Sequence, residues 1–190
     1  RVLAAGPKPA RDVVFLVTDA EEWGLIGAKE FFDRDPLAVR IGAVVNAEAR
    51  GSRGRAVMFQ TSPGNGALID LWADTAVGPS GNSLAGDVYR RLPNDTDLSV
   101  PLAMGITGIN AAYIDGLYDY HMPTDNIENI DPAAMQHLGN FALTTTRARS
   151  RYSMVGGISS STTSPTPLTP GFRPWRPRRC RRRRRPGRGG

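Results

Sequence analysis

The amino-acid sequence predicts an α/β domain with a largely parallel sheet, followed by a tail without fixed structure. Short apolar runs rich in β-branched residues alternate with segments whose apolar residues recur at helical spacing, a pattern typical of strands connected by helices. The length of 190 residues is enough for one domain with a sizeable core. Residues 1–131 contain all 18 acidic residues, whereas residues 132–190 contain 13 of the 24 basic residues and no acid.

The first expected elements are an approach loop over residues 1–11, a strand near 12–18 and a helix near 23–34. The run from 13 to 17 is unbroken and apolar, which indicates a strand buried on both faces. The apolar residues that follow recur at helical spacing. Asp35-Pro36 would end this helix, because a residue before proline is disfavoured in the helical region.

The remaining elements of the domain follow from the same two periodicities. A second buried strand is expected at 41–46 and a short third strand at 56–60, with a turn at 51–54 between them. Helices at 67–76 and 85–92, a fourth strand at 109–114 and a last helix from 131 to about 149 complete it. The last helix has Asp131 as its expected N-cap and Pro132 in its first turn.

The sequence therefore divides into a domain over residues 1–149 and a tail over 150–190. Serine, threonine and proline dominate the first half of the tail and arginine the second, so it contains too little apolar surface to offset chain entropy. Such a polycation could bind nucleic acid or an anionic surface without specificity, and the alternative is an unselected terminus. The single cysteine, Cys180, lies in this tail and excludes an intrachain disulfide.

Acidic residues and a histidine follow three of the expected strands. Glu21 and Glu22 follow the first strand, Glu48 the second and His121 the fourth. In open α/β sheets, ligands bind beyond the carboxyl ends of the strands, where these side chains can converge. Carboxylate oxygens and imidazole nitrogens are ligands suited to zinc. The sequence thus indicates a zinc site at this edge of the sheet.

Each of these residues also has a plain structural interpretation. The acid pair would suit a solvated first helical turn, where acids complement the helix dipole. Glu48 could pair with Arg50 or Arg53, and His121 could be an ordinary, partly buried loop histidine. The other histidine, His137, is expected in the middle of the last helix, with no role beyond that helix.

Four short segments, taken together, resemble the signature of the di-zinc aminopeptidases of metallopeptidase family 28. These segments are Asp19-Ala20-Glu21-Glu22-x-Gly24-Leu25-x-Gly27-Ala28, Asn46-Ala47-Glu48-x-x-Gly51, Asn94-Asp95-Thr96-Asp97 and Tyr120-His121-x-x-x-Asp125. They occur in the order of that family and span most of residues 10–148. The resemblance is greatest to the branch of endoplasmic-reticulum and vacuolar membrane metallopeptidases. It implies a three-layer α/β/α fold with a mixed sheet.

The resemblance also implies a role for each matching residue. Glu21 would be the general base that takes a proton from a metal-bridging water, work that needs a carboxylate near the water but not on the metal. Glu22 and His121 would share one zinc, and Glu48 would bind a second. Asp125 would orient the imidazole of His121. Two zincs would activate the water and stabilise the developing oxyanion of the peptide carbonyl.

Other positions match the family less completely. Many members have aspartate where this chain has Glu48, so the way in which the longer side chain would bind metal stays open. Asp95 and Asp97 match a motif near the site without an assigned role. The family draws a histidine and a bridging aspartate from segments upstream of the acid pair. The 20 residues before Glu21 contain no histidine and only one acid, Asp12, ahead of Asp19. We therefore expect the C-terminal portion of a peptidase domain, inactive by itself.

The function implied by the resemblance is zinc-dependent hydrolysis of peptide bonds at free amino termini, with peptides as substrates. One alternative is the chemistry of glutaminyl cyclases, which use a related fold with one zinc. The other is a catalytically dead peptidase-like domain that binds proteins. The sequence has no apolar run long enough to span a membrane and no module of the usual nucleic-acid-binding kinds. The family branch suggests a parent protein that is membrane-associated or secreted.

Overall fold

The computed structural model describes residues 2–151, within a compact unit formed by Arg1–Met154. Almost all of the predicted tail therefore lies outside the described residues. In chain order the elements are α1 (Val2–Ala5), α2 (Ile26–Arg34), the 3-10 turn η1 (Ala38–Arg40), β1 (Ala43–Ala49), β2 (Arg53–Thr61), α3 (Gly66–Thr75), α4 (Ser83–Tyr89), α5 (Ser99–Ala103), β3 (Thr107–Asp115), the 3-10 turn η2 (Leu117–Asp119) and α6 (Pro132–Arg151).

The strands form an open mixed sheet in the order β1-β3-β2. β3 is the central strand and pairs in parallel with β1 and antiparallel with β2. β1 and β2 follow each other in sequence without being neighbours, because β3 lies between them. The predicted mixed α/β sheet is thus confirmed, with one parallel and one antiparallel pair among the described strands.

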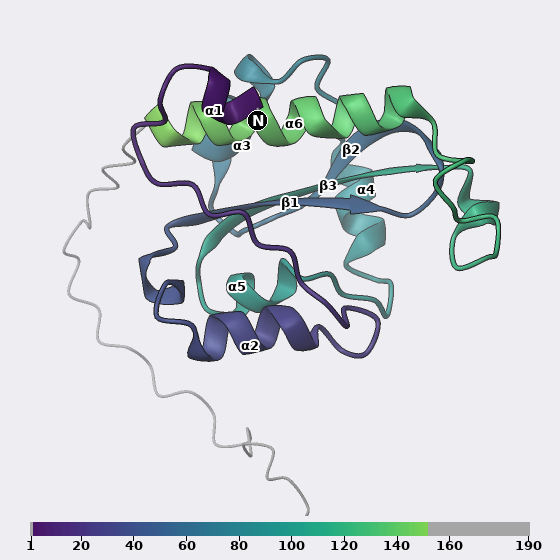
Figure 1. Ribbon diagram of the computed structural model, residues 1–190, viewed down its shortest axis with the longest axis horizontal. Coiled ribbons are helices and arrows are strands. Elements are labelled where there is room, and N and C mark those ends of the chain that lie inside the picture. Colours follow the sequence, from purple (N-terminus) through teal and green to yellow (C-terminus); the bar gives the residue numbers. More distant parts are fainter. Residues whose placement is uncertain (1, 152–190) are drawn as a thin grey trace, which may run out of the picture. The chain divides into compact units, whose positions relative to one another are not determined.

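Helices cover both faces of this sheet (Figure 1). α6 packs across all three strands and contacts α3 on the same face, whereas α5 contacts β3 and α2 on the opposite face. The prediction of three layers is confirmed by this arrangement. Within residues 2–151, no helix is long and apolar enough to cross a membrane.

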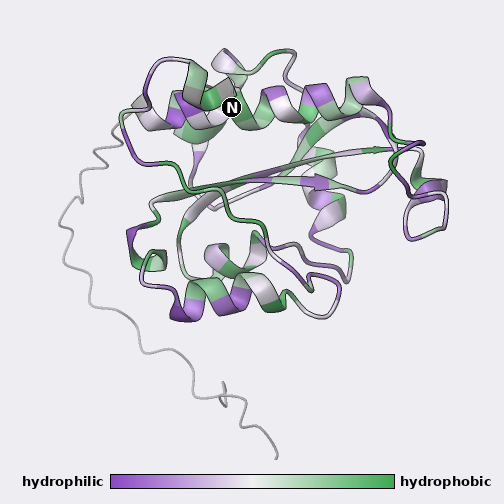
Figure 2. Ribbon diagram, in the orientation of Figure 1, coloured by the Kyte–Doolittle hydropathy of each residue, from purple (hydrophilic) through white to green (hydrophobic). Residues whose placement is uncertain are grey.

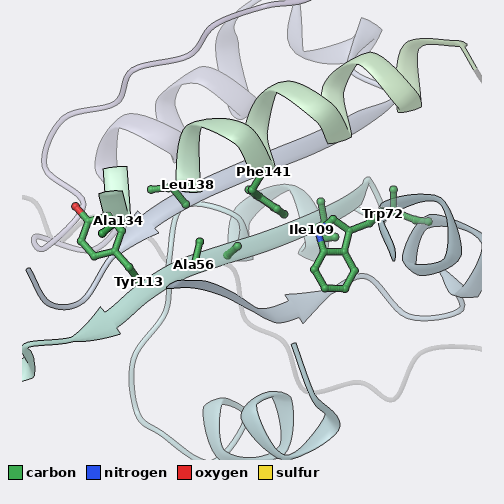
Figure 3. Packing of buried hydrophobic residues seen from close by; sticks show 9 residues of the cluster. Ala56, Trp72, Ile109, Tyr113, Ala134, Leu138 and Phe141 are labelled. Atoms are coloured by element: carbon green, nitrogen blue, oxygen red, sulfur yellow. The ribbon is translucent and has the colours of Figure 1, made fainter. Parts of the chain in front are cut away.

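The core lies between α6 and the sheet (Figure 3). Ala134, Leu138 and Phe141 recur along one face of α6 and point toward the sheet, where Ile109 and Tyr113 of β3 meet them. All five are buried, and Ile109 is fully inaccessible. Burying a leucine, isoleucine or phenylalanine side chain contributes about 1.5–3 kcal/mol. The long amphipathic helix is therefore stabilised mainly by the sheet that it covers.

The prediction of a strand near residues 12–18 is wrong. The segment is extended but pairs with no strand among the described residues, and Phe15 and Val17 are 80% and 93% exposed. Figure 2 shows this segment as hydrophobic over most of its length. An apolar β-branched run indicates a good fit to a pleated, half-buried surface, but the ladder still needs a neighbouring strand. Here the segment is tied by an ion pair between Asp12 and Arg40 at 3.4 Å.

Other elements differ from the prediction mainly at their ends. α2 begins at Ile26 instead of near residue 23, because Leu25, its N-cap, has a left-handed backbone with φ of 60°. α1 occupies part of the predicted approach loop, and α5 was not predicted. α5 has only five residues and contains Pro101. Such a short helix has little more than one turn, too few residues for apolar periodicity to be recognised.

His137 of α6 forms contacts outside its own helix. Its Nδ1 accepts a hydrogen bond from the backbone N–H of Ala56 in β2 at 3.0 Å, and its Nε2 lies 3.0 Å from the carbonyl oxygen of Gly78. The ring therefore joins α6 to the sheet and to the loop after α3. The prediction that His137 has no role outside its own helix is corrected by these two contacts.

Candidate metallopeptidase site

A strained turn between the extended segment and α2 carries the acid pair. Ala20 and Leu25, on either side of the pair, both have left-handed backbones, with φ of 57° and 60°. Non-glycine residues in this region are uncommon and concentrate at functional sites. Gly27 allows the turn to close, because its N–H donates to Asp19 O at 3.0 Å and a Cβ there would meet that same oxygen at 2.6 Å.

Glu22 and His121 meet across the site. His121 Nε2 lies 2.5 Å from Glu22 Oε1, although 99 positions separate the two residues in sequence. Both side chains remain more than half exposed. His121 also has a left-handed backbone, with φ of 58°. A bulky residue held in this conformation, with its ring nitrogen against a carboxylate, indicates a site with a specific geometric requirement.

The loop that carries His121 is anchored by a buried carboxylate. Asp119, 2% exposed, accepts a hydrogen bond from Ser52 Oγ at 2.5 Å and lies 4.0 Å from Arg53 Nη2. The Ser52 hydrogen bond holds the pKa of Asp119 below its usual value. Tyr120 stacks on the His121 ring with centroids 3.8 Å apart. These contacts restrict the position of the imidazole.

Glu48 lies within β1, close to its carboxyl end, and faces the same side of the sheet as Asn46. Asn46 Nδ2 donates to Glu48 Oε1 at 2.8 Å. The pKa of Glu48 is raised to about 7, chiefly by burial and further by the carboxylates of Glu21, Asp97 and Glu22, while the Asn46 hydrogen bond opposes this rise. Glu48 is therefore a desolvated carboxyl among like charges.

The two arginines considered as partners of Glu48 point elsewhere. Arg50 lies over the ring of Tyr120, 5.4 Å from its centroid, and Arg53 lies near Asp119 and over the ring of Tyr118. Within residues 2–151, no ion pair joins either arginine to Glu48. Neither of these two arginines therefore balances the negative charge around Glu48.

Glu21 belongs to the same group of charges. Burial raises its pKa, and so do the carboxylates of Glu22, Asp97 and Asp95, while His121 lowers it. The structure thus brings Glu21 and Glu22 together with both Glu48 and His121. A raised carboxyl pKa is the change that a general base working near neutral pH requires.

Asp97 also lies in the site, although no role for this residue followed from the sequence. Thr18 Oγ1 donates a short hydrogen bond to Asp97 Oδ2, which ties the extended segment to the loop before α5. Asp97 Oδ1 is buried and has no hydrogen-bond partner among the described residues. A buried carboxylate oxygen without a partner is costly and calls for an explanation such as an ion or a water. The available signal was the pair of acids on either side of Thr96 in a turn.

Asp125 lies four residues after His121 in an exposed stretch of the loop. Its backbone N–H donates to Met122 O at 2.9 Å, and its charge contributes to the raised pKa of Tyr113. No hydrogen bond joins Asp125 to the His121 ring in the part of the chain that the structure describes. Its role in orienting the imidazole stays a prediction.

The acid pair borders a shallow, open hollow of about 350 Å³, whose lining is Asp19, Ala20, Glu21, Glu22, Trp23 and Ile26. Glu22 and His121 supply one oxygen and one nitrogen donor in contact, and Glu48 supplies a further carboxylate. No group of three metal-binding side chains is complete among residues 2–151. The arrangement offers a carboxylate base beside two adjacent donors suited to zinc.

Comparisons with known proteins identify the family to which the chain belongs. The model of peptidase family M28 matches residues 1–146. The chain is 36% identical over 140 residues to "Putative endoplasmic reticulum metallopeptidase 1-A" of Caenorhabditis elegans and 35% identical over 144 residues to "Endoplasmic reticulum metallopeptidase 1" of Rattus norvegicus. It is 28% identical over 142 residues to "Vacuolar membrane protease" of Yarrowia lipolytica.

The similarity covers most of this chain and a small part of each relative. The matches take in 72%, 74% and 72% of the chain, but 16%, 16% and 14% of the three relatives in the same order. No solved structure matches the chain significantly. The family match nevertheless extends across the acid pair, Glu48 and His121. The chain belongs to peptidase family M28.

Proposed function

We propose that this chain supplies the general base and part of the zinc-binding groups of an aminopeptidase. The observation that carries the proposal is the 2.5 Å contact between His121 Nε2 and Glu22 Oε1, directly beside Glu21. Two donors that must bind one ion have to lie almost in contact, because each is about 2 Å from the metal. Membership of a peptidase family and the printed names of the relatives support the hydrolytic reaction.

The residues present fit zinc in their chemistry. Glu22 and His121 would hold one ion and Glu48 a second. The buried Asp97 oxygen, which has no hydrogen-bond partner within residues 2–151, and the raised pKa of Glu48 both indicate uncompensated negative charge, which a divalent cation would balance. Bound zinc lowers the pKa of coordinated water and polarises a carbonyl group.

Glu21 would receive the proton of the attacking water and deliver it to the leaving amine. It is suited to this because the turn holds it next to Glu22, and among residues 2–151 the hydrogen bond of the His121 imidazole goes to Glu22 instead. Its raised pKa brings proton affinity closer to neutral pH, which increases the driving force for accepting the proton. The short contacts of Glu22 and Asp119 keep the surrounding loop in place.

The substrate would be a peptide with a free amino terminus. The charge of Asp95, which acts on Glu21 and to which no zinc is assigned, supports a cationic substrate group beside the base. The peptidase family match supports hydrolysis over the two alternatives, a glutaminyl cyclase reaction and a catalytically inactive domain that binds proteins. Retention of Glu21 beside Glu22 also supports it, because a binding domain has no need of a general base.

The proposal is tested by Glu21→Gln in the complete peptidase domain that carries this chain. We expect turnover of an amino-terminal chromogenic substrate to fall about 10²–10⁴-fold, with bound zinc unchanged by elemental analysis. Glu30→Gln, on the exposed face of α2, is the matched control and should leave both values unchanged. His121→Ala should reduce the zinc content.

Three results would each contradict a part of the proposal. Full turnover by the Glu21→Gln variant would show that Glu21 is not the general base. Unchanged zinc content in the His121→Ala variant would show that His121 does not bind zinc. Equal cleavage of an amino-terminally acetylated substrate would show a peptidase that does not require a free amino terminus.

A further inference from the structure

A row of three amide side chains crosses the sheet beneath the site. Asn46 of β1 is paired with Asn110 of β3, and Asn110 is paired with Gln60 of β2, so each strand contributes one residue. Paired residues of neighbouring strands project from the same face of a sheet. This is the face opposite α6, where Asn46 also reaches Glu48.

Asn110 is the centre of this row and is fully buried. Its Nδ2 donates to Gln60 Oε1 at 3.1 Å and to Thr96 Oγ1 at 2.9 Å, and its Oδ1 accepts from Asn46 Nδ2 at 3.2 Å. Both donors of the amide group and its acceptor are thus engaged. This network favours one orientation of the amide, because a flip would place its oxygen against Gln60 Oε1 and its N–H groups against the donor Asn46 Nδ2.

The orientation of Asn110 is transmitted to Asn46. One N–H of the Asn46 amide donates to Asn110 Oδ1, which leaves the other directed at Glu48 Oε1 at 2.8 Å. If the Asn46 amide were reversed, its oxygen would face a carboxylate and the Asn110 oxygen. The central amide therefore controls which group Asn46 presents to Glu48.

At its other end, Asn110 is tied to the loop before α5. Thr96, 8% exposed, lies between Asp95 and Asp97, whose charges contribute to the raised pKa of Glu21. The hydrogen bond from Asn110 to the Thr96 hydroxyl thus connects the middle of the sheet to these acids. One buried side chain contacts the supports of two separate parts of the site.

We propose that Asn110 is a positioning residue of the site. It fixes the direction in which Asn46 presents its amide to Glu48, and it holds the Thr96 side chain against the sheet. The inference rests on the proposed function only in naming Glu48 as a zinc ligand. Thr96 and Asn46 each form a hydrogen bond with Asn110. An asparagine that only filled space would therefore not transmit a change at Thr96 to Asn46.

The test is the nuclear magnetic resonance of side-chain amide groups in the metal-free chain. Thr96→Val keeps the side-chain shape but removes the hydroxyl acceptor of Asn110. We expect the Asn46 side-chain amide resonances to shift and their hydrogen exchange to become about 2- to 10-fold faster, as the loss of one hydrogen bond implies. Asn110→Leu should give a larger change of the same kind.

Asn65→Ala is the matched control, because Asn65 is also buried but its amide donates to Ser62 Oγ instead of to a member of the amide row. Asn46 resonances should be unchanged in that variant. Unchanged Asn46 resonances and exchange in folded Thr96→Val would overturn the inference, even if Asn110→Leu does not fold.

A zinc titration of the same samples separates this inference from the proposed function. Positioning by Asn110 predicts that Asn110→Leu weakens zinc binding in the wild-type background but not in the Glu48→Gln background. An equal effect in both backgrounds would assign Asn110 a general structural role instead. Absence of zinc binding in all samples would contradict metal binding by this chain and leave the amide result to decide the inference alone.

Discussion

Ser52 donates its hydroxyl hydrogen to Asp119 Oδ2 at 2.5 Å, and both side chains are buried although 67 positions separate them. The backbone of Ser52 also binds both ends of the loop that carries His121. Its N–H donates to Asp115 O at 3.0 Å, and its carbonyl accepts from Asp131 N–H at 2.8 Å. One residue of the β1–β2 turn thus contacts the beginning, middle and end of that loop.

Ser52→Ala should therefore loosen the His121 loop without unfolding the domain. The backbone contacts of Ser52 survive the substitution, but Asp119 loses a buried hydrogen bond. We expect faster hydrogen exchange at the amides of Met122 and Asp125, whose protection depends on the folded loop. Ser83→Ala, at the exposed start of α4, should change neither amide. Identical exchange in the Ser52 variant would show that Asp119 is not the anchor.

The 190-residue chain alone should show no appreciable aminopeptidase turnover. Catalytic zinc usually has three protein ligands, and no such group is complete among the described residues. The measurement is cleavage of an amino-terminal chromogenic substrate by the purified chain with added zinc. Clear turnover that disappears in the Glu21→Gln variant would show that the site is already sufficient.

Phe141→Ala should be one of the most destabilising substitutions in the domain. Phe141 is 5% exposed and packs on the central strand from the middle of α6. Truncating a buried phenylalanine leaves a cavity and costs about 3–5 kcal/mol of unfolding free energy. Met135→Ala, on the same helix but 51% exposed, should change it by no more than about 0.5 kcal/mol. Urea denaturation of both variants gives the comparison.

Tyr113 should contribute to alkaline unfolding. Burial, followed by the charge of Asp125, raises the pKa of its phenol above the usual value near 10. The native state therefore keeps a proton that the unfolded chain loses, so this contribution to stability is complete below the unfolded pKa and is lost as pH rises through the folded pKa. Tyr113→Phe should reduce the loss of stability above about pH 10. Parallel curves for both proteins would contradict this assignment.

Local periodicity was sufficient to predict the helices α2, α3 and α6 and the three paired strands. These elements are defined by residues that are near one another in sequence, and only their ends moved. Local periodicity could not show whether residues 12–18 form a strand. Residues such as Phe15 and Val17 have a high β-strand propensity, but that propensity does not show whether a neighbouring strand is available to pair with them. The antiparallel direction of β2 likewise depends on where β3 inserts.

The candidate site shows the same division. Glu21, Glu22, Glu48 and His121 are predicted from a family signature and from their places after expected strands, although residues 12–18 form no strand and Glu48 lies within β1. Their supporting residues are not predicted. Asparagine and threonine inside or beside strands are individually unremarkable, and the connection of Asn110 to Thr96 exists only after the sheet has formed.

The central position of β3 determines when the site can form during synthesis. β1 and β2 leave the ribosome before β3, yet each has only β3 as a sheet partner among the described strands. Asn46 must wait for Asn110, 64 positions later, and Glu22 for His121, 99 positions later. Closing such long intervals slows folding, because chain entropy is lost before the contacts form. During this interval the nascent chain exposes two unpaired strands, and such unpaired edges are prone to aggregate until β3 has been synthesised.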